Sequence, residues 1–302
     1  MNKEQIKKAL KYRDRTVRVL SQDGHFRAVA SKTTATTSTA QKKHGLDYLP
    51  SLLLSRLMTS ATMMASFLKG EERISLEMQS KGPVKRVFAE SLQVGESRGF
   101  LEFNEDASEK RIDKLKDAFE AGVLVVSKIF YNKSEPIQGI VPIQNGDISS
   151  DLAYYYSQSE QIPTAVILDV EYDDNERIIS SGGLMVQAMP DSTKEEIDEL
   201  YENLMQMKDL AKLFREENSP QDVMKKVLPF DFKEMNNSPV DFYCRCSKDA
   251  FIDKLVTLHE DEIKGMQEDG QNELVCRYCN EHYYLDDSDF DKILQDIRAK
   301  KN

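Results

Sequence analysis

The sequence predicts a fold of three parts: an α+β core domain over residues 1–190, an amphipathic helical linker over 191–240 and a small zinc-binding domain over 241–302. A chain of 302 residues is long enough for about two domains. Residues 1–190 carry 25 basic and 25 acidic side chains, whereas residues 191–240 carry 7 and 12 and residues 241–302 carry 9 and 15. The whole net charge of −11 therefore lies beyond residue 190, and all four cysteines lie in the last part.

The core domain opens with a β-hairpin. Residues 16–30 read as two strands around Asp23-Gly24, a dipeptide typical of tight hairpin turns. Residues 49–68 carry few charges, and their apolar residues recur at helical spacing. This pattern predicts a helix that is buried on more than one face and is stopped by Gly70.

The rest of the core domain reads mostly as strands. The Thr/Ser-rich stretch 31–40 is expected to form a loop or a strand edge, and residues 148–158 a helix. Short apolar runs between Gly and Pro turn signals predict strands at 73–79, 84–89, 99–103, 123–130, 137–143 and 165–172. Many strands with few interleaved helices favour an α+β domain over a βαβ repeat.

The predicted linker begins with an amphipathic helix. Ser192 and Glu195 match the Ser-x-x-Glu capping box that typically opens a helix. Apolar residues then recur at near-heptad spacing among many charges: Ile197, Leu200, Leu204, Met207, Ala211 and Phe214. Such a helix is stable only when its apolar face packs on something. Two interpretations stay open: the helix is docked permanently on the core, or it is a conditional linker that unfolds or re-docks and bares that face.

The cysteines form two close pairs, Cys244-Arg-Cys246 and Cys276-Arg-Tyr-Cys279, separated by 29 residues. Four thiolates in two pairs match the ligand set of one tetrahedral, structural Zn²⁺. The C-x-C pair is the rarer of the two, and it leaves two sulfurs close along the backbone, poised for oxidation once metal leaves. Three interpretations stay open: an inert structural zinc site, a zinc site that senses oxidants, or a thiol oxidoreductase that uses the C-x-x-C pair.

The predicted zinc domain is small, so we expect a bound metal to stabilise its fold. Apolar spacing predicts a helix around residues 251–258 and a second one at 262–266, and residues 274–275 and 283–285 read as short strands that flank the second cysteine pair. His259 and His282 could also bind metal, but four cysteines already complete the set, so both are expected to be surface or packing residues.

Several classes of protein find no support. An acidic zinc module argues against nucleic acid, since phosphate binding depends on a concentrated basic surface. Neither a G-x-x-x-x-G-K-[ST] phosphate loop nor a G-x-G-x-x-G turn occurs, which argues against an ATP-driven machine or a dinucleotide enzyme. No apolar run suits a secretory signal or a membrane span. Paired cysteines without such a signal favour a reducing compartment, with the cytosol as the default.

The cysteine region resembles the zinc redox switch of the heat-shock protein 33 family. The likeness covers roughly residues 15–300 in order, and its motifs are Phe242-x-Cys244-x-Cys246-Ser247, Cys276-x-Tyr278-Cys279-Asn280 with Tyr283, Gly139-Ile140-Val141, Tyr156 to Gln161 with Pro163, and Gly182-Gly183-Leu184. One departure is the charged segment 171–177, which reads as a longer hairpin.

The resemblance implies a cytosolic, ATP-independent holdase chaperone of the stress response, and not an enzyme. Cys244, Cys246, Cys276 and Cys279 would bind one Zn²⁺ when reduced, and oxidation would form the Cys244–Cys246 and Cys276–Cys279 disulfides, release zinc and unfold the switch and the linker. The exposed linker residues Ile197, Leu200, Leu204, Met207 and Phe214 would then bind unfolding client proteins. The family also implies a homodimer when oxidised, and hand-off of clients to the ATP-driven 70-kDa chaperone system for refolding. The alternative from another class is a constitutive zinc module whose acidic face binds a protein partner.

Overall fold

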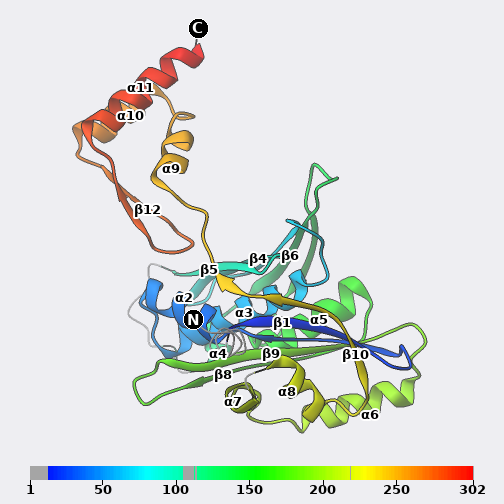
Figure 1. The fold of residues 1–302 in the computed structure, drawn as a ribbon. Helices are drawn as coiled ribbons and strands as arrows, with labels where there is room; N and C mark the ends of the chain where they lie inside the picture. Colours follow the sequence, from blue (N-terminus) through cyan, green and yellow to red (C-terminus); the bar gives the residue numbers. More distant parts are fainter. Residues whose placement is uncertain (1–12, 105–111, 113, 218, 302) are drawn as a thin grey trace, which may run out of the picture. The chain divides into compact units, whose positions relative to one another are not determined.

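The computed structural model, drawn in Figure 1, describes residues 13–104, 112, 114–217 and 219–301. The first twelve residues of the predicted core domain and the last residue of the predicted zinc domain lie outside these ranges. The chain forms two compact units that divide between Tyr243 and Cys244. The four cysteines belong to the second unit, and the segment predicted as a linker belongs to the first. Within the described ranges, no helix combines the length and the apolar character that crossing a bilayer requires.

Two sheets form the frame of the first unit. Among the described residues, one sheet has the strand order β10-β1-β2-β9-β8 and the other β11-β5-β4-β3-β6-β7. The short β11 pairs with β5 in parallel, while the other neighbours pair antiparallel. The strands of the first sheet are β1 (Arg15–Ser21), β2 (Phe26–Lys32), β8 (Thr164–Tyr172), β9 (Ile178–Ala188) and β10 (Phe232–Pro239), and those of the second are β3 (Arg73–Ser80), β4 (Val84–Leu92), β5 (Glu96–Phe103), β6 (Gly122–Ile129), β7 (Ile137–Pro142) and β11 (Asp241–Phe242).

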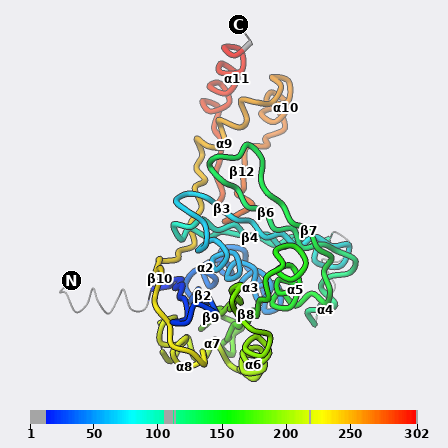
Figure 2. The backbone as a smooth tube through the Cα atoms, turned by 90° about the vertical axis from the view of Figure 1, so that its right-hand side faces the viewer, coloured from blue at the N-terminus to red at the C-terminus, as the bar shows by residue number. Residues whose placement is uncertain are grey.

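A layer of helices fills the space between the two sheets (Figures 1 and 2). The central helix packs on both sheets, which explains why its sequence is apolar around most of its circumference. It forms the main core with apolar side chains from both sheets, among them Val29 and Met185 of one and Leu76 and Val87 of the other. The helices of the layer are α2 (Thr34–His44), α3 (Tyr48–Ala65) and α5 (Ile148–Tyr155), which continues as the π-helical turn η2 (Tyr156–Glu160); α4 (Leu115–Ala118) is a single turn.

A second layer of helices covers the other face of the five-stranded sheet. It consists of α6 (Lys194–Met205), α7 (Leu210–Glu217) and α8 (Pro220–Val227), which Figure 1 shows on the side of that sheet away from α3. Strand β2 shows how one sheet serves two cores, because successive side chains point to opposite faces. Val29 belongs to the core around α3, whereas its neighbours Ala28 and Ala30 belong to a second core under α6–α8.

The stretch 31–40 was expected to be a loop or a strand edge, and that prediction is wrong for most of it, since only Ser31 and Lys32 lie at the end of a strand. Residues from Thr34 onward form α2. Thr and Ser disfavour helices in isolation because their hydroxyls compete for backbone groups. Here tertiary partners satisfy them: the Thr36 amide and hydroxyl both donate to Asp14 Oδ2 at 2.8 Å, and the Thr33 and Thr59 hydroxyls lie 2.7 Å apart. A sequence pattern contains no record of such distant partners.

The other core predictions need smaller corrections. The predicted central helix ends at Ala65 rather than at residue 68, and its expected stop Gly70 lies in the following turn with a φ of +56°. The helix predicted at 148–158 changes to a π-helical turn after Tyr155. The predicted hairpin and strands are all present, and the charged segment 171–177 is the β8–β9 connection of a long hairpin, as expected. Strand β9 itself was not predicted, because its two glycines and two serines weaken the strand pattern.

The predicted linker is helical, but it consists of three short helices and a strand instead of one long helix. Its first helix is capped by Thr193 with Glu196, one residue later than the predicted Ser192 and Glu195 pair, because the Ser192 hydroxyl donates to the carbonyl of His25 instead. The helix is interrupted at residues 206–209, where Asp209 adopts a φ of +56°. Helix α8 and strand β10 were not predicted, and β10 pairs with β1 along its whole length.

The second unit folds around a core of its own. Helices α9 (Lys248–Leu255) and α10 (Glu260–Glu268) and the hairpin of β12 (Glu273–Val275) and β13 (His282–Tyr284) agree with the predicted elements to within a few residues. Helix α11 (Asp287–Lys301) was not predicted. Its Phe290, Ile293, Leu294 and Ile297 are buried against Ile252, Val256, Ile263 and Leu285.

Candidate functional site

The four cysteines converge on one point of the second unit. All four Sγ atoms lie within 4.8 Å of one another, and none of the four cysteines forms a disulfide. Cys246 Sγ lies 3.3 Å from Cys279 Sγ, and Cys244 Sγ lies 3.7 Å from Cys276 Sγ. Cys276 and Cys279 are buried, while the C-x-C pair is partly exposed. The structure thus brings together the four residues that the sequence singles out as metal ligands.

Local backbone structure places each pair. The second pair lies in the loop of the β12–β13 hairpin, where the Cys276 carbonyl accepts hydrogen bonds from the amides of Cys279 at 3.3 Å and Asn280 at 2.7 Å. Asn280 closes this turn in the left-handed region, with a φ of +54°. The first pair enters α9 directly, because the Ser247 side chain caps that helix by accepting from the Ala250 amide at 3.1 Å.

The arrangement fits a tetrahedral zinc ion. Four sulfurs at the usual Zn–S bond length of about 2.3 Å lie about 3.8 Å from one another, close to the observed 3.3 and 3.7 Å separations. A disulfide would instead need about 2.05 Å. Neither histidine of the unit belongs to the cluster: His282 pairs with Glu273 at 2.7 Å, and His259 starts α10 through a hydrogen bond from its amide to Glu262. The group that could hold a metal ion therefore consists of four cysteines and includes neither histidine of the unit.

Polar neighbours make the sulfurs unequal. The Tyr283 hydroxyl lies 3.3 Å from Cys246 Sγ and 3.2 Å from the Cys246 carbonyl oxygen. Burial opposes ionisation of Cys246, but the contact with Tyr283 and the neighbouring thiols outweighs burial, so the pKa of Cys246 is lowered. Burial raises the pKa of Cys279. Lys248, two residues after Cys246, pairs with Asp289 at 2.5 Å.

The apolar linker residues lie in the second core of the first unit. Leu200, Leu204 and Phe214 are buried there, and Ile197 and Met207 are partly buried against the same cluster. The surface that the sequence offers for client binding is therefore covered by the five-stranded sheet in this structure. A docked helix agrees with both interpretations of the segment, since a conditional linker must also be docked in one of its states.

Two glycines of β9 allow close packing on the two faces of the sheet, and Gly182 is the one that lies under the docked linker. A Cβ atom on Gly182 would lie 2.4 Å from the Phe214 ring, and one on Gly183 would lie 2.8 Å from Leu168 on the other face of the sheet. Around this contact the Ser180 hydroxyl donates to the Ala211 carbonyl at 2.6 Å, and the Ala211 amide donates to Asp169 Oδ2 at 2.9 Å. These anchors were not predicted, although adjacent glycines inside a strand do signal a close approach of packed groups.

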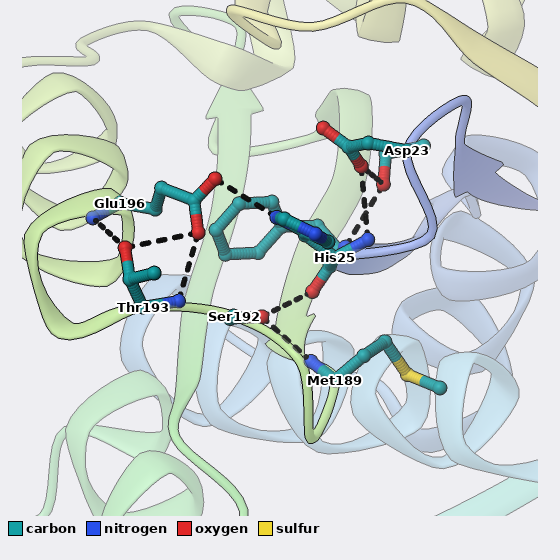
Figure 3. A network of polar contacts seen from close by, with 8 residues as sticks. Asp23, His25, Met189, Ser192, Thr193 and Glu196 are labelled. Atoms are coloured by element: carbon teal, nitrogen blue, oxygen red, sulfur yellow. Dashed lines mark hydrogen bonds and ion pairs between the residues drawn. The ribbon is translucent and has the colours of Figure 1, made fainter.

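The first helix of the linker is tied to the β1–β2 turn through His25 (Figure 3). The His25 carbonyl accepts from the Met189 amide at 2.8 Å and from the Ser192 hydroxyl. Its ring Nδ1 lies 2.8 Å from Glu196 Oε1, while Glu196 Oε2 accepts from the Thr193 amide at 2.8 Å and so completes the capping box. One histidine thus holds the entry of α6 by its backbone and its side chain.

Comparison with known proteins places these features in a family. The family model described as Hsp33 protein matches residues 14–286. The "33 kDa chaperonin" of Desulforamulus reducens is 33% identical over 293 residues, which cover 95% of this chain and 99% of that protein. The "33 kDa chaperonin" of Syntrophotalea carbinolica is 34% identical over 278 residues, covering 90% and 96%. A crystal structure of the 33 kDa chaperonin (heat shock protein 33 homolog) of Thermotoga maritima superposes with a TM-score of 0.84 at 25% identity and covers 96% of this chain and all of that one.

Proposed function

The chain belongs to the Hsp33 family, and from this we propose that it is a redox-regulated, ATP-independent holdase. The family consists of chaperones and not enzymes, so binding of unfolded client proteins follows from membership. The thiol oxidoreductase considered for the C-x-x-C pair is thereby excluded. The finer proposal concerns regulation: one Zn²⁺ bound by Cys244, Cys246, Cys276 and Cys279 keeps the chaperone inactive, and oxidation of these thiols activates it.

The convergence of four thiols within 4.8 Å carries this proposal. A zinc ion held by these four residues would link chain segments 29 residues apart and would keep the thiols as thiolates, which are their oxidisable form. A structural zinc site contributes on the order of 10 kcal/mol to folding. The second unit has only 59 residues, from Cys244 to Asn302, so loss of such a contribution would exceed the stability of most domains of its size.

Oxidation would remove the zinc ligands by converting their thiolates into disulfides. Two thiolates of one pair lose two electrons and form a disulfide, while one hydrogen peroxide takes up those electrons and two protons and becomes two waters. We propose that the pairs are Cys244–Cys246 and Cys276–Cys279, as in the family. The cross pairs Cys246–Cys279 and Cys244–Cys276, whose sulfurs lie 3.3 and 3.7 Å apart, are the competing products. Peptide mapping of the oxidised protein distinguishes the two patterns.

Unfolding of the second unit then acts on the linker. The chain enters that unit directly after β10 and β11, and α6–α8 precede those strands. We propose that the linker helices leave the sheet and expose Ile197, Leu200, Leu204, Met207 and Phe214 to clients. Methionine suits such a surface because its flexible thioether adapts to varied partners. We further propose that the active form is a homodimer, acts in the cytoplasm and releases clients to the ATP-driven 70-kDa chaperone system.

The test is aggregation of an unfolding client protein, followed before and after peroxide with mild heat, with zinc release recorded in the same sample. Suppression of aggregation should appear only as about one zinc per chain leaves, and dithiothreitol with zinc should reverse it. Zinc that stays bound without any gain in suppression would favour the alternative, a constitutive zinc module with an acidic interaction face.

Replacement of two ligands gives the matched test. The double variant Cys244→Ser, Cys246→Ser should bind no zinc and should lose its response to peroxide. The control is His282→Ala, which removes a nearby potential ligand that pairs with Glu273 instead of joining the cluster, and which should keep the zinc and the response. A peroxide response that persisted in the double variant would contradict the proposed switch.

A further inference from the structure

The methionines of the chain divide by exposure. In the central helix and the sheets of the first unit, Met58, Met63, Met64, Met78 and Met185 are buried. In the linker segment, Met224 is fully buried, Met205 and Met235 are 62% and 52% exposed, and Met207 is partly exposed while it packs against the second core. An oxidant in solution can therefore reach Met205, Met207 and Met235 in the folded protein, whereas the methionines of the main core are shielded.

Met207 differs from the two exposed methionines in its surroundings. It lies in the interruption between α6 and α7, between two buried residues, Leu204 and Leu210. The Met207 amide donates to the Leu204 carbonyl at 3.1 Å, and two residues later the chain turns through Asp209 in the left-handed region. The Met207 side chain thus packs against the second core at the point where the helical hydrogen-bond ladder is interrupted. Local opening is expected to start at such a point.

We propose that Met207 is a second oxidation site, and that its conversion to methionine sulfoxide loosens α6 and α7 from the five-stranded sheet independently of the cysteines. The inference rests on the proposed function in one respect, since it assumes that undocking of the linker exposes the client-binding surface. Oxidation of Met207 would act on the linker directly, outside the zinc site.

The chemistry needs only a peroxide. A lone pair on the Met207 sulfur attacks one oxygen of hydrogen peroxide, the S–O bond forms as the O–O bond breaks, and the other oxygen leaves as water after proton transfer. The sulfur is oxidised by two electrons and the peroxide is reduced by two. The product turns a flexible apolar side chain into a polar one. At Met205 and Met235 the new oxygen would stay in water, but at Met207 it would lie against the apolar second core, where a polar group without a partner is costly.

Oxidation of the cysteines and oxidation of Met207 are reversed by different reductants. Dithiothreitol reduces disulfides and allows zinc to rebind, but it does not reduce methionine sulfoxide at a comparable rate. Methionine sulfoxide reductases A and B, one for each sulfoxide epimer, do so. A protein that has been oxidised and then treated with dithiothreitol and zinc should therefore have a restored zinc site and a linker that is still loosened.

The experiment follows amide hydrogen exchange of residues 200–214 in the full-length protein after peroxide and then dithiothreitol with zinc, with mass spectrometry of each methionine. Exchange in the wild type should stay at least about tenfold faster than before oxidation, because a polar group at an apolar contact shifts the local opening equilibrium. The reductases should return it to the starting rate. Met207→Leu should show no residual effect, while the controls Met205→Leu and Met235→Leu should behave as the wild type does.

The unoxidised variant Met207→Gln, a polar mimic, provides a second readout and should exchange faster before any treatment. Exchange that returned to its starting rate with sulfoxide present at Met207, or an absence of Met207 sulfoxide once Met205 is fully oxidised, would overturn the proposal. Zinc release recorded in the same samples tests the cysteine switch separately, so a failure of either proposal is recognised by itself.

Discussion

At the scale of single residues, the docking of the linker depends on a missing side chain. Phe214 is fully buried, and its ring occupies the space that a Cβ atom on Gly182 would need. Such a Cβ atom would also lie 2.7 Å from the carbonyl oxygen of Ser31. A packed aromatic ring on one face and the backbone of a paired strand leave no room to adjust. The Gly182-Gly183 motif that carries part of the family resemblance therefore has a direct physical role in this chain.

Replacement of Gly182 by Ala should undock α7. Overpacking of a filled core typically costs about 1–3 kcal/mol, and here the displaced group is the buried Phe214 ring. Amide exchange of residues 210–217 should accelerate, and the zinc-bound protein should suppress client aggregation without peroxide. The matched control is Gly265→Ala in α10, where no atom lies within 4 Å of the new methyl group and an Ala should be neutral or favourable. A Gly182→Ala protein with unchanged exchange would mean that this contact does not hold the linker.

At the scale of elements, the entry of α6 depends on pH through His25. The hydrogen bond to Glu196 is the largest cause that raises the pKa of His25, burial opposes it, and the charges of Glu196, Asp23 and Asp191 raise it further. Since this pKa lies above the value of about 6.5 in an unfolded chain, the stabilisation is complete below about pH 6.5. It is lost as the pH rises through the raised pKa of the folded protein.

The predicted result is a pH-dependent start of α6. The His25 ring should titrate above 6.5 in an NMR experiment, and amide protection of residues 194–200, corrected for intrinsic exchange, should decrease as the pH rises above about 6.5. His25→Gln should remove this dependence. The control His282→Gln changes the other histidine that pairs with a glutamate, in the second unit, and should leave it intact. Equal pH dependence in the two variants would assign the effect to another group.

The elements also show where sequence reasoning succeeds and fails. Asp23-Gly24 and the alternating strands were predicted because their signals are local. Helix α2 was missed because its threonines find partners, such as Asp14 and Thr59, that are distant in sequence. Strand β10, whose sequence Phe232–Pro239 is polar and contains two asparagines, was missed because pairing with β1 and not its composition makes it a strand. The cysteine cluster was predicted from its spacing, whereas the anchors at Ser180 and Asp169 depend on tertiary contacts.

At the scale of the whole molecule, the two units have separate cores, so their stabilities can be changed separately. The core of the second unit includes Ile293, which is fully buried and lies in the unpredicted helix α11. Metal is therefore not the only stabilising element expected there. Apolar packing by α9, α10 and α11 adds to the contribution of the proposed zinc site, and either one can be removed by itself.

Ile293→Ala should lower the oxidant threshold of the protein. Truncation of a buried Ile typically costs 2–5 kcal/mol, which should unfold the second unit at a lower temperature or peroxide concentration while the first unit keeps its transition. Calorimetry with and without a zinc chelator measures the two transitions. Leu258→Ala, in the same unit but 39% exposed, is the matched control and should change little. A single transition that moved as one in both variants would contradict separate units.

The strand after the linker helices connects both sheets of the first unit. β10 is the outer neighbour of β1, and a few residues on, β11 is the outer neighbour of β5, where the amides of Asp241 and Tyr243 donate to the carbonyls of Gly95 and Ser97 at 3.0 Å each. Residues 232–243 thus close an edge on each sheet with main-chain hydrogen bonds. If this strap peeled away together with the linker, β1 and β5 would become open sheet edges, each presenting unpaired donors and acceptors that any extended polypeptide can match whatever its side chains.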